Sequence, residues 1–376
     1  MFRRDLQEAI EKWLNKSKII LLYGARQVGK TTLCKQILEK YSKTFKIQYF
    51  NCELFDVKKF FEISSDNALR YMIGENKLII LDEAQTVKDI GKTLKIISDT
   101  MPDVKVIATG SSSFDLANKL SEPLTGRAIS FILYPFSIRE LKNNTSFINA
   151  TGELDHILTT GCYPEIFNAS KNEAERLLNL LAGNYLYKDI FMYENIKNPH
   201  QLTELLQLLA LQVGNEVSYN EIGQKLGMNR ITVIKYIDIL EKSFVIFKLH
   251  AFNRNKRNEI SKSIKIYFYD LGIRNALIQS FAPLSLRADV GALWENFCIV
   301  EKRKLNQILD RFVNQYFYRT YEGEEVDYIE EYNGKLDGYE FKYSKENIKL
   351  PKHFIEQYKP QVFKTINKNN WFEFVI

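Results

Sequence analysis

The stretch Gly24-Ala25-Arg26-Gln27-Val28-Gly29-Lys30-Thr31 decides the fold of the first part of this chain. It matches the pattern G-x-x-x-x-G-K-[ST] at every fixed position, with an apolar run before it (18–23) and helical spacing after it (32–41). Glycines at both ends let the backbone curl so that consecutive N–H groups point inward at phosphate oxygens. The stretch therefore predicts a phosphate-binding loop between a strand and a helix; an ordinary glycine-containing turn is the alternative.

Each part of this loop has an expected role in holding a nucleotide. Lys30 would reach the β- and γ-phosphates, and the hydroxyl of Thr31 would ligate Mg²⁺. The helix that begins near Lys30 adds the positive end of its dipole. The pattern thus predicts ATP and Mg²⁺ as cofactors. The residues expected to bind the nucleotide are Gly24, Ala25, Arg26, Gln27, Val28, Gly29, Lys30, Thr31 and Thr32.

A second motif supplies acidic groups for the same chemistry. The apolar run 78–81 ends in Asp82 and Glu83. Asp82 is expected to hold the Mg²⁺ shell, and Glu83 to orient and deprotonate the attacking water. An acidic pair after a strand can also be a solvated loop, but the spacing from the phosphate loop favours the functional interpretation.

Two further residues are candidates for the same site. Ser111 follows the apolar run 104–109 and is a candidate sensor of the γ-phosphate. Arg127 precedes the run 129–133 and could stabilise transition-state charge in the same or a neighbouring subunit. Serine-rich strand ends and surface arginines are also common without such roles.

The arrangement of apolar runs predicts an α/β fold for this part of the chain. Strand-like runs alternate with segments of helical spacing, which favours a parallel sheet covered on both faces. The runs are continuously apolar, as strands buried on both sides are. The expected strands are 18–23, 45–50, 77–81, 105–109 and 129–133.

Length and composition set limits on the whole chain. A chain of 376 residues predicts two or three domains, and 45% hydrophobic with 26% charged residues excludes a disordered or fibrous protein. No apolar run reaches the roughly 20 residues of a membrane span, and the start lacks a signal-peptide core. A cytoplasmic protein without a membrane partner is therefore expected. The net charge of +6 is compatible with nucleic-acid contact or simply with a solvated surface.

The sequence resembles the P-loop ATP-binding proteins of bacteria and archaea that join an AAA+-like ATPase domain to a C-terminal domain of unknown function. This resemblance covers nearly the whole chain and implies an ATPase. It also implies a sheet in which the strand before Ser111 lies between the strands that precede Lys30 and Asp82. The matching motifs are GARQVGKTT (24–32), LIILDEAQ (78–85), ATGSSS (108–113), LTGR (124–127), GCYPEIF (161–167), YLYKDI (185–190) and KIYFYDLGIRNAL (265–277).

The segment 217–249 has the pattern of a winged helix–turn–helix. A helix over 219–226, a turn at Gly227-Met228 and a helix from Asn229 to about 242 precede a strand at 244–249. Asp238 and Glu241 dilute the positive charge, and such modules also bind proteins. DNA contact is nonetheless favoured. The residues expected to meet DNA are Arg230, Thr232, Lys235 and Tyr236, with the basic stretch 254–265 (Arg254, Lys256, Arg257, Lys262 and Lys265).

The C-terminal part contains a predicted hairpin. Asn333-Gly334 is a strong two-residue turn signal between the strands 325–332 and 336–343. The register set by this turn places Asp327 directly opposite Glu340. Opposed carboxylates repel, and a divalent cation between them would offset that repulsion.

This hairpin resembles the core of PD-(D/E)XK nucleases. The resemblance implies a second metal site of Glu295, Asp327 and Glu340, in which Lys342 would position a water. The alternatives are a solvent-facing charged strand or a retired nuclease fold that only binds. The chain is thus expected to comprise an ATPase domain (1–140), a helical region (141–213), a winged-helix region (214–290) and a nuclease-like domain (291–376).

Two functional hypotheses remain open from the sequence. In the first, the protein hydrolyses ATP with Mg²⁺ and couples hydrolysis to DNA handling. In the second, it is a nucleotide switch that turns over slowly, and its output is a change in DNA or protein binding. Assembly into a homo-oligomer is a separate possibility.

Overall fold

The chain forms two compact units, each with its own sheet. The computed structural model describes residues 2–16, 19–62, 65–110, 124–144, 151–193, 198–252, 263–320, 322–344 and 350–376. The first unit comprises Met1–Pro135 with Lys242–Phe244, and the second comprises Phe136–Glu241 and Val245–Ile376. The structural boundary therefore lies a few residues before the predicted end of the first domain at 140.

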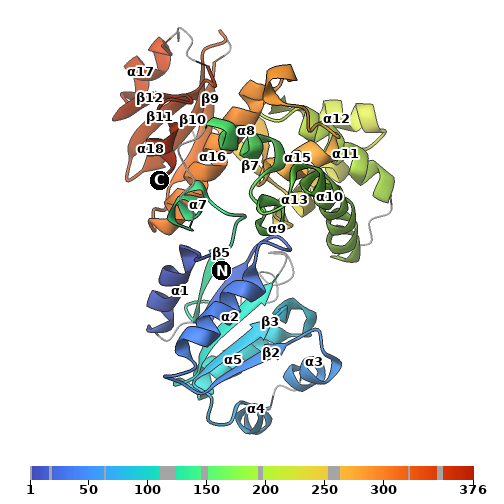
Figure 1. Ribbon diagram of the computed structural model, residues 1–376, viewed down its shortest axis with the longest axis vertical. Coiled ribbons are helices and arrows are strands. Elements are labelled where there is room, and N and C mark those ends of the chain that lie inside the picture. Colours follow the sequence, from blue (N-terminus) through green and yellow to red (C-terminus); the bar gives the residue numbers. More distant parts are fainter. Residues whose placement is uncertain are drawn as a thin grey trace. The chain divides into compact units, whose positions relative to one another are not determined.

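The first unit is built on a five-stranded parallel sheet with the order β2-β3-β4-β1-β5 (Figure 1). The predicted α/β class is confirmed, and so is the implied position of β4 between β1 and β3. The strands are β1 (Ile19–Tyr23), β2 (Ile47–Asn51), β3 (Leu78–Asp82), β4 (Lys105–Gly110) and β5 (Ala128–Ile132). All but one residue of β1, β3 and β4 are buried, as their apolar sequences predict.

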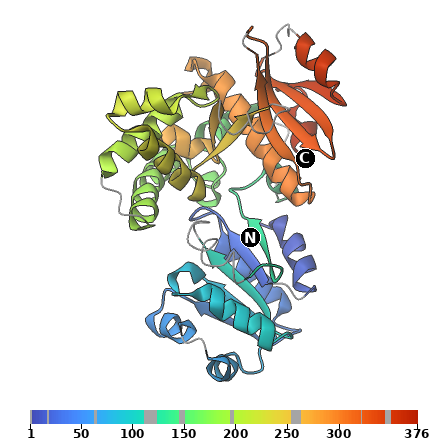
Figure 2. The ribbon, with the colours of Figure 1, turned by 180° about the vertical axis from the view of Figure 1, so that it is seen from behind.

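Helices cover both faces of this sheet. The chain moves one way along the sheet from β1 to β2 and the other way from β3 to β4, and parallel crossovers are right-handed. The crossover helices α2 and α5 therefore lie on opposite faces, as Figures 1 and 2 show. The helices are α1 (Leu6–Leu14), α2 (Lys30–Tyr41), α3 (Phe55–Phe61), α4 (Asp66–Ile73) and α5 (Ile90–Thr100), with the short 3₁₀ helix η1 (Ala84–Thr86).

The second unit begins with a series of helices, which includes the segment predicted as a helix–turn–helix. Its helices are α7 (Ile138–Asn144), α8 (Thr151–Thr160), α9 (Pro164–Phe167), α10 (Lys171–Tyr193), α11 (Pro199–Leu211), α12 (Tyr219–Leu226), α13 (Arg230–Lys242) and α15 (Leu271–Leu277). The 3₁₀ helix η2 (Leu284–Leu286) and the helices α16 (Val290–Ile308), α17 (Lys352–Tyr358) and α18 (Trp371–Val375) follow.

One mixed sheet of seven strands runs through this unit, in the order β12-β11-β10-β9-β7-β8-β6. Its strands are β6 (Glu216–Val217), β7 (Ile246–Ala251), β8 (Ile264–Phe268), β9 (Asn314–Arg319), β10 (Glu325–Tyr332), β11 (Lys335–Phe341) and β12 (Val362–Ile366). β7 pairs with β9 in parallel, which joins the predicted winged-helix strands to the predicted nuclease-like strands. The expected boundary at 290/291 thus falls within a single continuous sheet.

Aromatic side chains fix α16 against the C-terminal strands. The indole N–H of Trp294 donates to the carbonyl oxygen of Ile366 at 3.1 Å, and its ring packs against Phe297, Tyr343 and Trp371. A second apolar cluster under α17 contains Tyr318, Val326, Ile329, Leu336 and Phe354. The sheet therefore has apolar packing on both faces, which fixes the strands that carry the predicted acidic residues.

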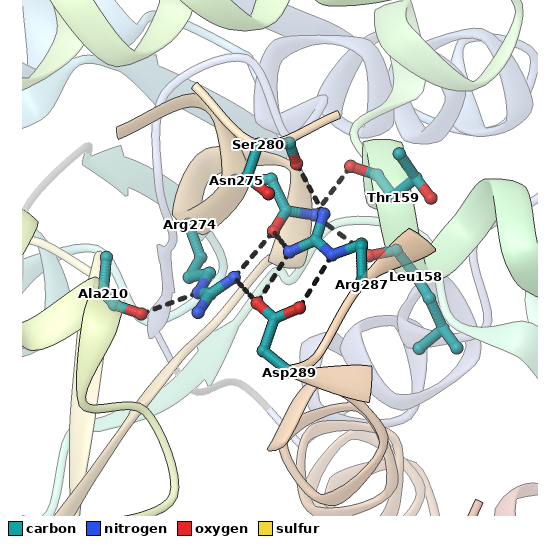
Figure 3. A network of polar contacts seen from close by, with 8 residues as sticks. All are labelled: Leu158, Thr159, Ala210, Arg274, Asn275, Ser280, Arg287 and Asp289. Carbon is teal, nitrogen blue, oxygen red and sulfur yellow. Dashed lines mark hydrogen bonds and ion pairs between the residues drawn. The ribbon is translucent and has the colours of Figure 1, made fainter. Parts of the chain in front are cut away.

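A buried polar network ties four helices of the second unit together (Figure 3). Arg274 donates to the carbonyl oxygen of Ala210 at 2.7 Å and to Asp289 at 2.6 Å. The amide of Asn275 donates to the carbonyl oxygens of Leu158 and Thr159, and Arg287 bonds Asp289 through two nitrogens. The network connects α8, α11, α15 and the start of α16, so Arg274 and Asn275 of the motif at 265–277 have packing roles.

A close approach joins two of the motifs that carry the family resemblance. A Cβ at Gly161 would lie 2.1 Å from Asp270, and a Cβ at Gly272 would lie 2.1 Å from the carbonyl oxygen of Thr160. The carboxylate of Asp270 accepts from the N–H groups of Cys162 and Gly272 at 2.7 and 2.8 Å. These glycines are therefore needed for contact between the end of α8 and the start of α15.

Candidate functional site

The loop between β1 and α2 is shaped by left-handed backbone conformations. Gly24, Gln27 and Gly29 have φ angles of 152°, 60° and 96°. A Cβ at Gly24 would lie 2.3 Å from the carbonyl oxygen of Leu133, so a larger residue does not fit there. The predicted nucleotide-binding residues 24–29 form this loop, and residues 30–32 form the first turn of α2.

Lys30 lies across this loop. Its side chain is buried, with 5% of the residue exposed. The ammonium donates to the carbonyl oxygens of Gly24 and Ala25 at 2.9 and 2.8 Å. Because carbonyl oxygens are weaker partners for an ammonium than phosphate oxygens, a bound nucleotide would take over these hydrogen bonds.

Asp82, the last residue of β3, accepts hydrogen bonds from three hydroxyl groups. Its Oδ2 accepts from the hydroxyl of Thr31 at 2.8 Å and from that of Tyr49. Its Oδ1 accepts from the hydroxyl of Thr109 at 2.5 Å. The predicted partners Thr31 and Asp82 are therefore in direct contact, although 51 residues separate them in sequence.

This pair fits the binding of Mg²⁺. The ion prefers hard oxygen ligands, usually one or two from the protein with the others from water and phosphate. Thr31 and Asp82 supply a hydroxyl and a carboxylate oxygen 2.8 Å apart beside the loop. These two residues would hold the ion that accompanies a nucleotide.

Glu83 lies directly after Asp82 in a strained backbone conformation. Its φ angle of 55° is unusual for a residue other than glycine, and such strain is common at functional sites. The N–H of Glu83 donates to Thr109 Oγ1 at 3.0 Å, and the amide of Gln85 donates to its carboxylate at 2.5 Å. The side chain is half-buried, so its carboxylate is held in place and still reaches solvent.

Three residues of this site were not predicted from the sequence. Thr109 and Tyr49 both bind Asp82, and the guanidinium of Arg4 donates to the carbonyl oxygen of Val28 in the loop. Burial and then the bond to Asp82 raise the pKa of the Tyr49 hydroxyl, so it remains a donor. Thr109 could have been found from its place at the end of a strand in the motif ATGSSS; Tyr49 and Arg4 carry no such signal.

Arg127 lies far from this site in its own chain. It directly precedes β5, whose first residue Ala128 pairs with Ile19 at the start of β1. The loop follows the other end of β1, which at about 3.3 Å per residue is roughly 15 Å away. Arg127 instead forms two bonds to Asp99, at 2.6 and 3.1 Å. The predicted role within the same chain is wrong, and a role in a neighbouring subunit stays a prediction. Ser111 lies outside the described residues.

Comparison with known families supports the assignment of the first unit. Residues 16–142 match the family described as "AAA domain". This match supports a P-loop ATPase-type domain in the first unit. Beyond this ATPase domain, residues 151–284 and 290–370 match two families described as domains of unknown function (DUF8612 and DUF4143).

Proteins of similar sequence align with most of the chain. An uncharacterized protein of Mycobacterium tuberculosis is 25% identical over 349 residues, which cover 90% of this chain and 74% of that protein. An uncharacterized protein of Methanocaldococcus jannaschii is 25% identical over 381 residues, covering 96% and 80%. Among solved structures, AMPPCP-bound DnaA from Aquifex aeolicus has 16% identity and a TM-score of 0.31, covering 64% of this chain and 86% of that chain.

The predicted acids of the second unit lie close together. The observed pairs from Tyr332↔Lys335 to Tyr328↔Tyr339 have the predicted register, and the next step along it places Asp327 opposite Glu340. Burial, and then the nearby carboxylate of Asp327, raise the pKa of Glu295 to about 7. The hairpin and the helix α16 therefore assemble the three predicted carboxylates.

Two lysine side chains and a backbone N–H already pair with the carboxylates of this cluster. Lys265, 2% exposed, pairs with Glu295 at 3.2 Å and with Glu325 at 2.7 Å. Lys342 pairs with Glu340 at 2.9 Å, and Asp327 accepts from the N–H of Phe341 at 2.8 Å. Across the described ranges, no group of three or more His, Cys, Asp or Glu side chains is placed to hold a metal ion. The predicted metal ligands Glu295, Asp327 and Glu340 do not fit a metal site as they stand.

The two helices predicted at 219–226 and 229–242 are α12 and α13, and the strand predicted at 244–249 lies two residues later, as β7. Asn229 caps α13 by accepting from the N–H of Thr232 at 2.8 Å, and Arg230 and Lys235 are exposed. Tyr236 is only 5% exposed, so its predicted contact with a DNA groove is wrong. Lys265 is likewise buried in β8 and cannot contribute to a basic surface. The rest of the basic stretch, residues 254–262, lies outside the described residues.

The acidic residues of this segment have an internal partner. Lys248 of β7 pairs with Asp238 at 2.6 Å and with Glu241 at 2.8 Å. The two acids thus face the strand, and part of their charge is neutralised there. Where the structure is described, it contains no helix with the length and apolarity that a membrane crossing needs.

Proposed function

We propose that this protein binds ATP with Mg²⁺, hydrolyses it in the ATPase domain, and uses the nucleotide cycle to control binding by its second unit. The observation that carries the proposal is the contact between Thr31 and Asp82 beside the glycine loop, with Glu83 held next to it. This arrangement provides a phosphate cradle, two oxygen ligands and a base at the carboxyl ends of β1 and β3, the two strands that flank β4.

The chain's own residues have separate tasks in this reaction. The loop N–H groups and Lys30 hold the phosphates, while Thr31 and Asp82 hold the ion. Mg²⁺, when bound, neutralises charge on the phosphate oxygens. Glu83 accepts a proton from the attacking water, and Gln85 fixes its carboxylate at 2.5 Å. Thr109 bridges Asp82 and the N–H of Glu83, which keeps the two acids in a fixed relation.

Replacing Glu83 by glutamine tests the base. Glu83→Gln should retain ATP binding while turnover falls on the order of 10²–10⁴-fold, because an amide cannot accept the proton of the water. Steady-state phosphate release and equilibrium ATP binding are measured on the same preparation. Glu75→Gln, at an exposed position paired with Lys46, is the matched control and should retain wild-type turnover. Wild-type turnover in Glu83→Gln would remove Glu83 from the mechanism.

The second unit is proposed to bind DNA through a winged-helix module. The order of elements from α11 through β6, α12 and α13 to the strands β7 and β8 supports this proposal. β7 and β8 pair in antiparallel fashion and β6 pairs with β8, as in a three-stranded wing sheet. The exposed Arg230 and Lys235 at the start of α13 are suited to phosphate and groove contacts.

Charge removal tests this DNA surface. The quadruple variant Arg230→Ala, Lys235→Ala, Arg254→Ala and Arg257→Ala should bind DNA more weakly and with a flatter salt dependence, because fewer counterions are released. Fluorescence anisotropy with a labelled duplex at several salt concentrations measures both quantities. The control removes four exposed lysines elsewhere in the second unit, namely Lys335, Lys352, Lys359 and Lys364. Equal affinity and equal salt slope in the test variant would eliminate the winged module as the DNA surface.

A nucleotide switch is the second candidate function. The ion pairs within the carboxylate cluster favour it, since Lys265 and Lys342 neutralise groups that a nuclease would use for metal. The second unit would then recognise DNA or protein without cleavage. ATP turnover with and without DNA separates the two hypotheses. Strong stimulation by DNA indicates coupled hydrolysis, and slow turnover that DNA leaves unchanged indicates a switch.

A further inference from the structure

We infer that Arg4 is a positioning residue of the nucleotide site, which holds the phosphate-binding loop in its binding conformation. This inference rests on the proposed binding of ATP. Arg4 lies ahead of α1, outside the motifs of the ATPase domain. It is nevertheless buried, with 5% of the residue exposed, and its guanidinium reaches the loop between β1 and α2.

The first contact of Arg4 orients a peptide of the loop. One nitrogen, Nη1, donates to the carbonyl oxygen of Val28 at 2.7 Å. In a planar trans peptide the C=O of one residue and the N–H of the next point in opposite directions. None of the described peptide bonds is cis, so the N–H of Gly29 points away from Arg4. Arg4 thereby fixes the direction of a donor at the start of α2, where the helix has no internal partner for its first N–H groups.

The second contact connects the loop to the segment after β5. The nitrogen Nη2 of Arg4 donates to the carbonyl oxygen of Tyr134 at 2.6 Å. The preceding residue, Leu133, bonds the carbonyl oxygen of Tyr23 through its N–H at 2.7 Å and packs against Gly24. Leu133 and Tyr134 thus support both ends of the loop, and Arg4 makes the connection at the Gly29 end.

The positive charge of Arg4 also favours nucleotide binding at the loop. A guanidinium remains protonated at all relevant pH values. Its Nη1 is 3.6 Å from the position that a Cβ at Gly29 would occupy. A buried positive charge so near the first turn of α2 favours an anion there. The segment that carries Arg4 is itself attached to α2, because the amide of Gln36 donates to the carbonyl oxygen of Phe2 at 3.0 Å.

Arg3 provides a matched control. It is the same residue type one position earlier, but its side chain is 69% exposed and pairs with the exposed Glu8. Arg3→Met and Arg4→Met therefore remove the same group from neighbouring positions. Arg3 is exposed to solvent, whereas Arg4 is buried against the loop. Arg4→Lys retains the charge but replaces the two-pronged guanidinium by a single ammonium.

The experiment compares nucleotide affinity, kinetic constants and stability in the full chain. Arg4→Met should raise the Kd for ATP and ADP and the KM for ATP by about 10-fold or more, the loss expected for a hydrogen bond from a charged donor. The kcat should change much less, because Asp82 ends β3 and Glu83 directly follows it, whereas the two contacts of Arg4 described above go to backbone oxygens of the loop and of the segment after β5. Arg4→Lys should be intermediate, and Arg3→Met should match the wild type. All affinities are measured at temperatures where circular dichroism shows each variant to be folded.

The outcomes separate positioning from a structural role. A lower melting temperature with unchanged Kd and KM in Arg4→Met would overturn the inference. If Arg4→Met does not fold, Arg4→Lys decides, and wild-type affinity in that variant overturns it. Failure of both to fold beside an intact Arg3→Met would make Arg4 purely structural and also overturn it. A wild-type protein that binds no ATP would overturn the proposed function as well, whereas normal wild-type binding confines a failure to Arg4.

Discussion

ATP turnover is expected to fall on the order of 10²–10³-fold when Lys30 is replaced by alanine, the loss typical of removing one charged donor from a transition state. In the structure the ammonium lies across the loop, bonded to the carbonyl oxygens of Gly24 and Ala25. A nucleotide would replace these neutral acceptors by charged phosphate oxygens, which bind an ammonium more strongly. Alanine removes that gain and leaves the loop carbonyls without their donor, so ATP binding should weaken as well.

The measurement is steady-state phosphate release together with equilibrium ATP binding at constant Mg²⁺. Lys35→Ala is the matched control, since Lys35 lies one turn further along α2 and is exposed. It should retain both binding and turnover. If Lys30→Ala hydrolyses ATP at the wild-type rate, the glycine loop is not the catalytic nucleotide site and the proposed function fails.

Replacing Lys265 by methionine is expected to destabilise the second unit by about 3–5 kcal/mol, the cost of breaking a buried ion pair from one side. Methionine retains most of the apolar stem of the lysine but leaves Glu295 and Glu325 without their shared cation. Burial alone would lower the pKa of Lys265, but these carboxylates raise it above its usual value. The ammonium is therefore held as a cation in the fold, and its charge cannot be removed without cost.

Urea unfolding followed by tryptophan fluorescence measures this loss, because two of the three tryptophans, Trp294 and Trp371, lie in the second unit. Lys335→Met, at the exposed first residue of β11, should be nearly neutral. The double variant Lys265→Met with Glu295→Gln should recover part of the loss. A stability change below about 1 kcal/mol in Lys265→Met would show that the cluster does not depend on the lysine.

The loss of stability in Lys265→Met should depend on pH. The pKa of Glu295 is raised to about 7 in the fold, above its usual value of 4.5. The folded state therefore binds the proton more tightly than the unfolded chain does, and this contribution to stability is lost as pH rises through about 7. Without Lys265 the folded state has more to gain from protonating Glu295. The loss in Lys265→Met should consequently be smaller near pH 5 than near pH 8.

Much of the nucleotide site was predictable because its residues are specified locally. The glycine loop, Lys30 and Thr31 are consecutive, and Asp82 and Glu83 end a strand whose apolar sequence is unambiguous. The carboxyl ends of parallel strands share one edge, so the contact between Thr31 and Asp82 follows from the fold class. Arg127 was misplaced although the same rule applies to it: it precedes β5, and the amino ends of parallel strands lie at the edge opposite the loop.

In the C-terminal hairpin, too, the local features were predictable and the contacts with distant segments were not. Asn333-Gly334 fixes the turn type, the turn type fixes the register, and the observed pairs between β10 and β11 are the predicted ones. The occupancy of the resulting cluster by Lys265 was not predictable. Lys265 lies 62 positions before Asp327 in a segment that reads as basic and polar, and only the pairing of β8, β7 and β9 brings it there.

The sequence by itself therefore determined the α/β class, the phosphate loop, the acidic strand end and the hairpin register, because each depends on residues that are adjacent or separated by one turn. The tertiary structure alone decided what surrounds them. Arg4 reaches Val28 and Tyr134 only because the segment before α1 packs behind the loop. Lys265 is a buried counter-ion rather than a surface charge only because β7 joins both halves of the second sheet. Contacts between distant segments depend on the packing of whole elements, and the local patterns that specify a turn or a strand contain no record of them.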